Sequence, residues 1–266
     1  MKNTQIISVI NQKGGVGKTT TVINLATALS FYKKKILVID LDPQGNATTG
    51  LGVENSSDTK TIYDVLNGSI NFEKAIRDTK IDNLKLVSSN VELSGLEVET
   101  ASENRRAFLL KDNIENFINS NSNDFSYIFI DCPPSLNLLT VMSLVVAKSL
   151  IVPLQAEFFA LEGLSQLMKT IERVKIKLNP ELEIRGVLLT MFDKRNKLSL
   201  QVDHEARKFF DKKVYETVIP RNVRLSEAPS HGVPILIYDK SCSGSRSYAD
   251  FAQEFLKQES LMESAA

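Results

Sequence analysis

Short apolar runs alternate with amphipathic stretches along nearly the whole chain. Runs of β-branched and other apolar residues, typical of buried strands, occur at residues 6–10, 35–40, 84–87, 127–131, 150–153, 184–191 and 214–219. Helices are predicted at residues 21–29, 61–66, 72–77, 103–119, 160–178, 198–211 and 245–257. This alternation predicts an α/β fold with one doubly wound, mainly parallel sheet and helices on both faces.

Nothing in the sequence divides this pattern into separate parts. The chain contains no internal repeat, low-complexity segment or linker, and the polar loop predicted at residues 119–124 is short. We therefore expect a single domain over residues 1–258, followed by a frayed C-terminal tail over residues 259–266.

A glycine-rich turn joins the first predicted strand to the first predicted helix. It consists of Gln12, Lys13, Gly14, Gly15, Val16, Gly17, Lys18, Thr19 and Thr20. A phosphate-binding P-loop requires this context, because glycines let successive N–H groups point inward and the helix N-terminus adds partial positive charge. We expect a polyphosphate here, with Lys18 against its β- and γ-phosphates and the Thr19 hydroxyl on Mg²⁺.

Acidic residues stand at the ends of two other predicted strands. Asp40 and Asp42 lie at the end of the strand at residues 35–40, where the sequence turns polar. Asp131 ends the strand at residues 127–131, in the pattern of a Walker B strand whose carboxylate reaches Mg²⁺ through water. Because the carboxyl ends of parallel strands share one edge with the P-loop, we expect these carboxylates to face a bound nucleotide.

Composition narrows the class of protein. The 266 residues are 42% apolar and 24% charged with a formal net charge of zero, which is unlike a uniformly basic nucleic-acid binder. Cys132 and Cys242 are far apart, so neither a disulfide framework nor a cysteine zinc site is expected. Polar residues and a proline interrupt the apolar region 136–154, which favours a buried helix and strand over a membrane span. Since the first strand leaves no room for a signal peptide, we expect a cytoplasmic protein.

The glycine-rich turn departs from the standard G-x-x-x-x-G-K-[ST] pattern. Gln12 takes the place of the first glycine, and Lys13 adds a second lysine. In this form the turn resembles the deviant Walker A motif of the ParA/MinD family of dimer-forming ATPases. The stretches at residues 155–163 and 219–230 resemble the ParA/Soj subgroup, the chromosome and plasmid partition ATPases, so the resemblance covers nearly the whole chain.

The resemblance implies roles for individual residues. Lys13 matches the signature lysine that crosses to the partner's phosphates in an ATP-bound sandwich homodimer, where it would act as an arginine finger does. Asp42 matches the carboxylate that positions the attacking water. The implied catalytic residues are Lys13, Lys18 and Asp42; the nucleotide contacts are Lys13, Gly14, Gly15, Val16, Gly17, Lys18, Thr19, Thr20, Pro220 and Asn222; and the magnesium ligands are Thr19, Asp40 and Asp131.

The resemblance also implies binding to double-stranded DNA without sequence preference, and release when a ParB/Spo0J-type protein stimulates hydrolysis. Residues 165–246 carry 16 Lys and Arg against 10 Asp and Glu, an excess that by itself is usually a solvated surface. The candidate DNA contacts are Arg195, Lys197, Arg221 and Arg224. Pairing two subunits would double the phosphate contacts, which gives ATP a physical means of switching DNA binding on.

Two other classes of function remain open at this point. A MinD-like protein binds anionic lipid through a basic amphipathic C-terminal helix, but residues 251–259 contain one lysine and two glutamates. An iron–sulfur reductase component would need cluster cysteines, which Cys132 and Cys242 do not resemble. A metabolic ligase of the same superfamily would need a substrate pocket, which the sequence alone does not reveal.

Overall fold

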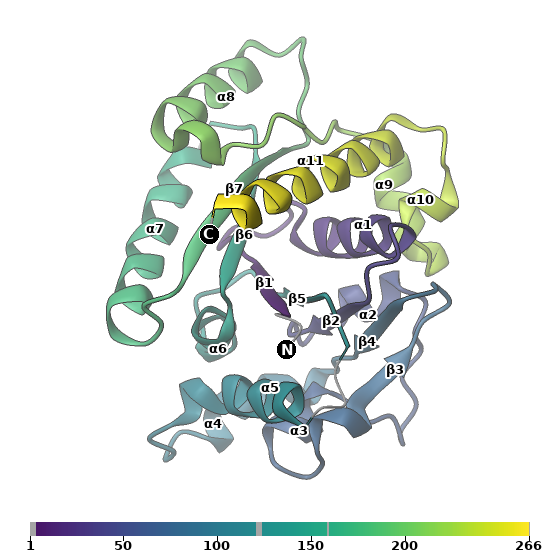
Figure 1. The fold of residues 1–266 in the computed structure, drawn as a ribbon, viewed down its shortest axis with the longest axis vertical. Coiled ribbons are helices and arrows are strands. Elements are labelled where there is room, and N and C mark those ends of the chain that lie inside the picture. The colour runs from purple at the N-terminus through teal and green to yellow at the C-terminus, as the bar shows by residue number, and fades with distance from the viewer. Residues whose placement is uncertain (1–3, 121–123, 159, 266) are drawn as a thin grey trace.

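The computed structural model describes residues 4–120, 124–158 and 160–265. Within them, seven strands form one sheet in the order β3-β4-β2-β5-β1-β6-β7 (Figure 1). The strands are β1 Gln5–Val9, β2 Ile36–Asp40, β3 Ile76–Asp78, β4 Leu84–Val87, β5 Tyr127–Asp131, β6 Ser149–Gln155 and β7 Glu183–Thr190. All the pairings are parallel except that of β3 with β4, so the predicted mainly parallel sheet is confirmed.

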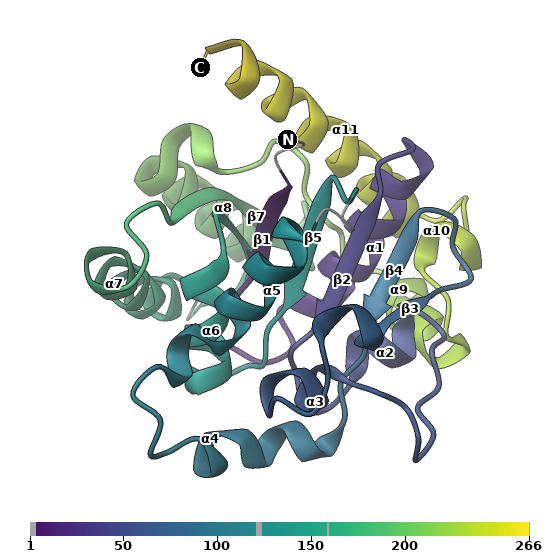
Figure 2. The ribbon, with the colours of Figure 1, turned by 60° about the horizontal axis from the view of Figure 1, so that its bottom comes forward.

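Helices cover both faces of the sheet (Figures 1 and 2). The α-helices are α1 Lys18–Phe31, α2 Asn46–Gly50, α3 Ile62–Leu66, α4 Leu96–Glu99, α5 Leu109–Asn119, α6 Leu138–Val146, α7 Ala160–Lys177, α8 Lys197–Phe210, α9 Val223–Glu227, α10 Ile235–Tyr238 and α11 Ser243–Ala265. Short 3₁₀ helices lie at Phe72–Ala75, Val91–Gly95, Arg106–Phe108, Asp211–Lys213 and Ala228–His231. α1 and α11 pack on one face and α5 and α6 on the other, while α7 and α8 cover β6 and β7.

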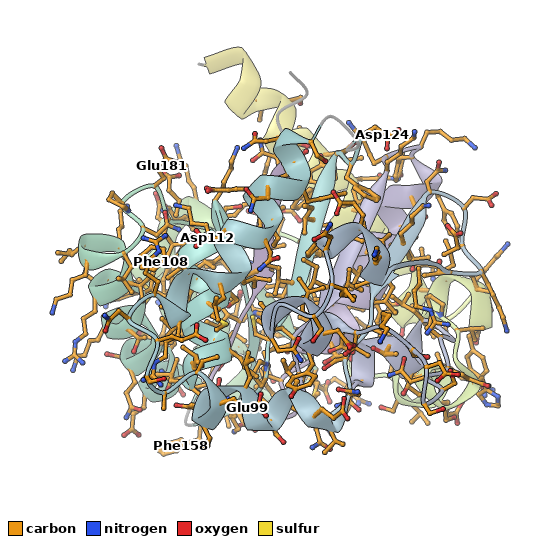
Figure 3. All side chains as sticks on the ribbon, turned by 90° about the horizontal axis from the view of Figure 1, so that it is seen from below. Glu99, Phe108, Asp112, Asp124, Phe158 and Glu181 are labelled. Atoms are coloured by element: carbon orange, nitrogen blue, oxygen red, sulfur yellow. The ribbon has the colours of Figure 1, made fainter. Side chains whose placement is uncertain are left out.

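The strand order brings the predicted functional residues to one edge. β1 lies between β5 and β6, and its last residue, Val9, pairs with Asp131 of β5. Asp131 also pairs with Asp40 at the end of β2. The turn after β1 and both acidic strand ends therefore meet at the carboxyl edge of the sheet. Figure 3 shows Phe158, which follows β6, and Asp124, which precedes β5, at opposite ends of the molecule.

α11 is anchored to the sheet by aromatic packing. Phe251 and Phe255 are fully buried, and the Phe255 ring lies edge-on to Tyr127 with a centroid separation of 5.6 Å. The Arg185 guanidinium lies 3.9 Å from the Phe255 ring centroid, in cation–π geometry. The helix continues to Ala265, beyond the end at residue 257 that the apolar spacing predicts.

Two predicted elements are wrong. Residues 214–219 are no strand: Val214 forms a single bridge with Val187, and the segment otherwise runs alongside β7 without a ladder. Residues 72–77 are no α-helix, because a short 3₁₀ turn ends at Ala75 and β3 then pairs antiparallel with β4. In both places tertiary pairing, which is limited to a single bridge at residues 214–219 and antiparallel at β3, decides the backbone conformation over local propensity.

The region at residues 136–154 folds as predicted, into α6 followed by β6. No helix within the described ranges is both long and apolar enough to cross a membrane. Residues 121–123 of the predicted polar loop, residue 159 of the stretch at 155–163 and residue 266 of the tail lie outside the described residues.

Truncating the anchor of α11 should destabilise the fold. We expect Phe255→Ala to lower the free energy of unfolding by about 3–5 kcal/mol, because it leaves a cavity between Tyr127 and Arg185. Phe209→Ala is the matched control: that ring is 71% exposed, and its loss should cost about 0.5 kcal/mol or less. Urea unfolding followed by circular dichroism measures both, and equal losses in the two variants would contradict this role of α11.

Candidate nucleotide site

The glycine-rich turn is held in shape by side chains from neighbouring strands. The Asn11 side chain donates to the Pro153 carbonyl at 2.8 Å and accepts from the Lys13 N–H at 3.0 Å. On the other side, the Thr190 hydroxyl donates to the Val16 carbonyl at 2.8 Å. Gly17, at the start of α1, has φ 91°, a conformation that other residues adopt only with strain. The turn is thus fixed between β6 and β7 in the form a phosphate nest requires.

A cavity of about 660 Å³ opens above this turn. A volume of this size accommodates a nucleotide. Of the predicted site residues, the lining includes Gly14, Gly15, Gly17, Lys18, Thr19, Thr20, Asp42, Pro220, Arg221 and Asn222. Val16 is buried and does not line the cavity, and its backbone carbonyl accepts from the Thr190 hydroxyl.

Lys18, in the first turn of α1, lines this cavity. Its side chain is 6% exposed, and its ammonium group donates to the Lys13 carbonyl at 3.1 Å. Burial lowers the pKa of Lys18, while the nearby charge of Asp131 opposes that shift. A buried ammonium group facing a cavity is complementary to an anion, and a phosphate would satisfy it.

Two of the predicted acids lie fully buried beside each other. Burial raises the pKa of Asp40 to about 6, although hydrogen bonds from Thr48 favour its charged form. Burial and the neighbouring charge of Asp40 raise the pKa of Asp131 well above its ordinary value. Neither Asp131 oxygen has a hydrogen-bond partner of good geometry in the described structure. The nearby Thr19 hydroxyl lowers the pKa of Asp131, but this effect is smaller than that of burial and of the Asp40 charge.

An orphaned buried carboxylate next to a threonine hydroxyl fits a magnesium site. Asp131, Asp40 and Thr19 provide only oxygen atoms, which Mg²⁺ prefers. No group of three or more His, Cys, Asp or Glu side chains in the described part of the chain could hold a metal alone. Mg²⁺ commonly binds through one or two carboxylates, waters and substrate phosphates, and these residues match that mode.

Asp42 follows the end of β2 and faces the cavity. Its side chain is 6% exposed and lines the cavity, while Asp42 Oδ1 accepts from the Gln44 N–H at 3.0 Å. Gly45, with φ 63°, then turns the chain into α2. The carboxylate is thereby positioned at the open side of the site, where it could orient a water molecule.

Lys13 differs from the rest of the turn. Its side chain is 45% exposed, does not line the cavity, and forms an ion pair with Glu157, which follows β6. Sequence reasoning did not single out Glu157, because only the fold brings the two segments together. The amino group of Lys13 is therefore directed towards Glu157 and does not face the cavity.

The opposite end of the cavity is built from β7 and the segment before α9. Pro220 and Asn222, the predicted adenine contacts, line it, but the Asn222 side chain already accepts from the Arg224 N–H and donates to the Ser243 hydroxyl, each at 2.8 Å. Sequence reasoning missed several lining residues, among them Thr190, Met191, Ser226, Pro229 and Tyr248. Met191 has φ 50°, a strained conformation at the end of β7 that no sequence pattern announces.

The four candidate DNA contacts lie on two neighbouring segments, but they differ in whether an acidic side chain already pairs with them. A bridge between Phe192 and Pro220 joins their two segments. Arg195 donates to both carboxylate oxygens of Asp193, each at 3.1 Å. Arg224 pairs with Glu227 at 2.8 Å and Asp239 at 3.8 Å. Arg221 lines the nucleotide cavity, and Lys197 is exposed at the start of α8.

The chain was compared with known proteins. The AAA domain family model matches residues 4–184. The chromosome partitioning protein ParA of Caulobacter vibrioides is 51% identical over 96% of this chain and 95% of its own. The sporulation initiation inhibitor protein Soj of Bacillus subtilis is 47% identical over 94% and 97%. Among solved structures, cobyrinic acid a,c-diamide synthase from Mycobacterium smegmatis, with bound ATP analogue and magnesium, has a TM-score of 0.84 at 32% identity and covers 96% and 95%.

The raised pKa of Asp131 has a consequence for stability. The native protein holds the Asp131 proton more tightly than the unfolded chain, so this group stabilises the fold at low pH and loses that effect as the pH rises through the raised pKa. Without nucleotide and Mg²⁺, we expect Asp131→Asn to raise the thermal midpoint on the alkaline side of the raised pKa and to lose this advantage as the pH falls below it.

Differential scanning calorimetry on both sides of the raised pKa measures the effect. Asp58→Asn, which changes an exposed carboxylate, is the control and should leave the midpoint unchanged. If the thermal midpoint of Asp131→Asn lies below that of the unaltered protein at every pH, the charged Asp131 carboxylate does not destabilise the fold, and the prediction is wrong.

Proposed function

The chain belongs to the ParA/Soj family of chromosome-partitioning ATPases, and on that premise we propose that it is a DNA-partition ATPase switched by ATP. It is an ATPase that uses ATP and Mg²⁺. In the proposed cycle, two ATP-bound copies form a homodimer, which binds double-stranded DNA without sequence preference. A ParB/Spo0J-type protein then stimulates hydrolysis and releases the DNA, so that a chromosome or plasmid is segregated on the nucleoid in the cytoplasm.

The position of Lys13 carries this proposal. A lysine within a phosphate-binding turn is expected to contact phosphate, yet Lys13 lies outside its own cavity and pairs with Glu157. This supports a role in trans, in which Lys13 leaves Glu157 and reaches the γ-phosphate bound to the partner subunit. A cation delivered in this way stabilises the charge that develops during phosphoryl transfer, and hydrolysis then depends on dimerisation.

The other residues would act within one subunit. Lys18 and the N–H groups of residues 14–20 would hold the β- and γ-phosphates, and Asp42 would orient the attacking water. Thr19, Asp40 and Asp131 would hold Mg²⁺, which when bound neutralises charge on the β- and γ-phosphates. Pro220 and Asn222 would contact the adenine.

DNA binding would depend on positive charge next to the nucleotide. Arg195 and Lys197 lie on one segment and Arg224 on another, and the bridge between Phe192 and Pro220 joins the two segments next to the cavity. In a single copy, Asp193 and Glu227 offset two of these charges. Dimerisation would double the number of basic residues that meet one DNA molecule, and affinity rises steeply with the number of phosphates neutralised.

Two competing functions fit less well. In a MinD-like role the C-terminal helix would bind lipid, but Tyr248, Phe251 and Phe255 of α11 are buried against the sheet. A ligase role is supported by the likeness to the diamide synthase, which at 32% identity is more distant than the partition relatives at 47–51%.

ATP should convert the protein from monomer to dimer. We expect Asp42→Ala, which binds ATP without hydrolysing it, to elute as a monomer without nucleotide and as a stable dimer with ATP and Mg²⁺ in gel filtration. Asp42→Ala combined with Lys13→Ala should remain monomeric, because the contact in trans is lost. A double variant that dimerises as well as the single one would contradict the role of Lys13.

Charge reversal near α9 should abolish DNA binding and leave nucleotide binding intact. For Arg195→Glu with Arg224→Glu, we expect no measurable binding of DNA with ATP present and an unchanged ATP affinity, because each reversal removes one phosphate contact and adds a repulsive charge. Lys208→Glu with Lys212→Glu, at the other end of α8, makes the same charge change and is the matched control. Fluorescence anisotropy with a short duplex measures both, and equal losses in the two pairs would remove Arg195 and Arg224 from the DNA site.

A further inference from the structure

Thr48 of α2 holds the buried carboxylate of Asp40. Asp40 Oδ2 accepts two hydrogen bonds from it, one from the backbone N–H at 2.8 Å and one from the hydroxyl at 2.7 Å. Asp40 is 0% exposed and Thr48 is 3% exposed. With two donors from one residue on the same oxygen, the orientation of the carboxylate is fixed, and both bonds favour its charged form.

The structure also determines where the hydroxyl hydrogen of Thr48 lies. Thr48 Oγ1 is 3.1 Å from the backbone nitrogen of Ser89, just beyond β4. A backbone N–H can only donate, so Thr48 accepts from Ser89 and its single hydrogen is available for Asp40. The Ser89 N–H, the Thr48 hydroxyl and the Asp40 carboxylate therefore form a chain of bonds that point the same way and polarise one another.

The same chain reaches the residue proposed to orient water. The second oxygen of Asp40, Oδ1, accepts from the backbone N–H of Asp42 at 3.2 Å. Turning the Asp40 carboxylate would therefore shift the start of the segment that carries the Asp42 side chain. Thr48 itself lines the neighbouring cavity behind this segment and does not line the nucleotide cavity.

We propose that Thr48 is a positioning residue of the nucleotide site, whose hydroxyl, tied to Ser89, aims the Asp40 carboxylate at magnesium and fixes the backbone of Asp42. The inference rests on the proposed magnesium role of Asp40 and is independent of DNA binding and dimerisation. Partners that orient a metal-binding carboxylate affect the metal site nearly as strongly as the ligand itself.

The test is Thr48→Val, which removes the hydroxyl and keeps the shape of the side chain. We expect the Mg²⁺ concentration for half-maximal binding of a fluorescent ATP analogue to rise about 10- to 100-fold. Binding of the analogue in EDTA should stay unchanged, because the P-loop is intact. The rate of ATP hydrolysis at saturating Mg²⁺ should also fall, and Thr48→Ser, which restores the hydroxyl, should recover both properties.

Two controls separate positioning from stability. Thr100→Val removes another buried threonine hydroxyl, which donates to the Leu96 carbonyl at 2.7 Å, and it should leave the Mg²⁺ requirement unchanged. In an Asp40→Asn background, Thr48→Val should have no further effect on the Mg²⁺ requirement, because it acts through Asp40.

Each contrary outcome has a distinct meaning. If Asp40→Asn changes the Mg²⁺ requirement and Thr48→Val does not, the positioning role is overturned while the magnesium site stands. If Thr48→Val and Thr100→Val raise the requirement equally, Thr48 is structural only. If Asp40→Asn itself leaves the requirement unchanged, the proposed magnesium role of Asp40 fails, and the inference fails with it.

Discussion

Two fully buried carboxylates stand beside each other at the carboxyl edge of the sheet, and the rest of the site is arranged around their charge. Asp40 and Asp131 are register partners on β2 and β5, so the sheet itself brings them together. Burial raises the pKa of both, the charge of Asp42 adds to the shift of Asp40, and the charge of Asp40 adds to that of Asp131. The nearby Lys18 offsets part of this negative charge, and a metal ion bound to a polyphosphate would offset the remainder. Nucleotide binding should therefore stabilise a region that the free protein holds at a cost.

Hydrogen bonds from several elements hold the surroundings of this edge in place and so offset the cost of burying the two carboxylates. The turn after β1 is tied to β6 by Asn11 and to β7 by Thr190. α1, which begins at the turn, is held by the Thr21 hydroxyl bonded to that of Tyr248 on α11. These supports come from distant parts of the chain, so the tertiary structure determines the shape of the site. Lys13 is different, since it is partly exposed and its ion-pair partner lies on a connecting segment.

Much of the fold and the centre of the site could be predicted from local sequence. The P-loop is a strand, a glycine-rich turn and a helix in succession, and Asp40 and Asp131 end apolar strands, so each signal is complete within a few residues. Glu157 and Thr48 could not be predicted, because their roles appear only when β6 and β4 are placed beside the turn and β2. The ion pair of Arg224 with Asp239 likewise joins residues that the fold brings together. Residues 214–219 have the pattern of a strand, but β7 forms only a single bridge with them, at Val214.

Mixing two inactive variants tests most directly whether the amino group of Lys13 acts on the partner's nucleotide. Lys13→Ala and Asp42→Ala should each be inactive alone, since one lacks the cation and the other the carboxylate at both sites. In a mixed dimer, the Lys13→Ala subunit keeps Asp42 and receives Lys13 from its partner, so one of the two sites is complete. A mixed dimer keeps one of the two Lys13 contacts, so an equal mixture should recover measurable ATPase activity, at most about the quarter of the unaltered rate that random pairing would give. If Lys13 served its own subunit, no mixed dimer would contain a complete site, and a mixture as inactive as its components would contradict the exchange between subunits.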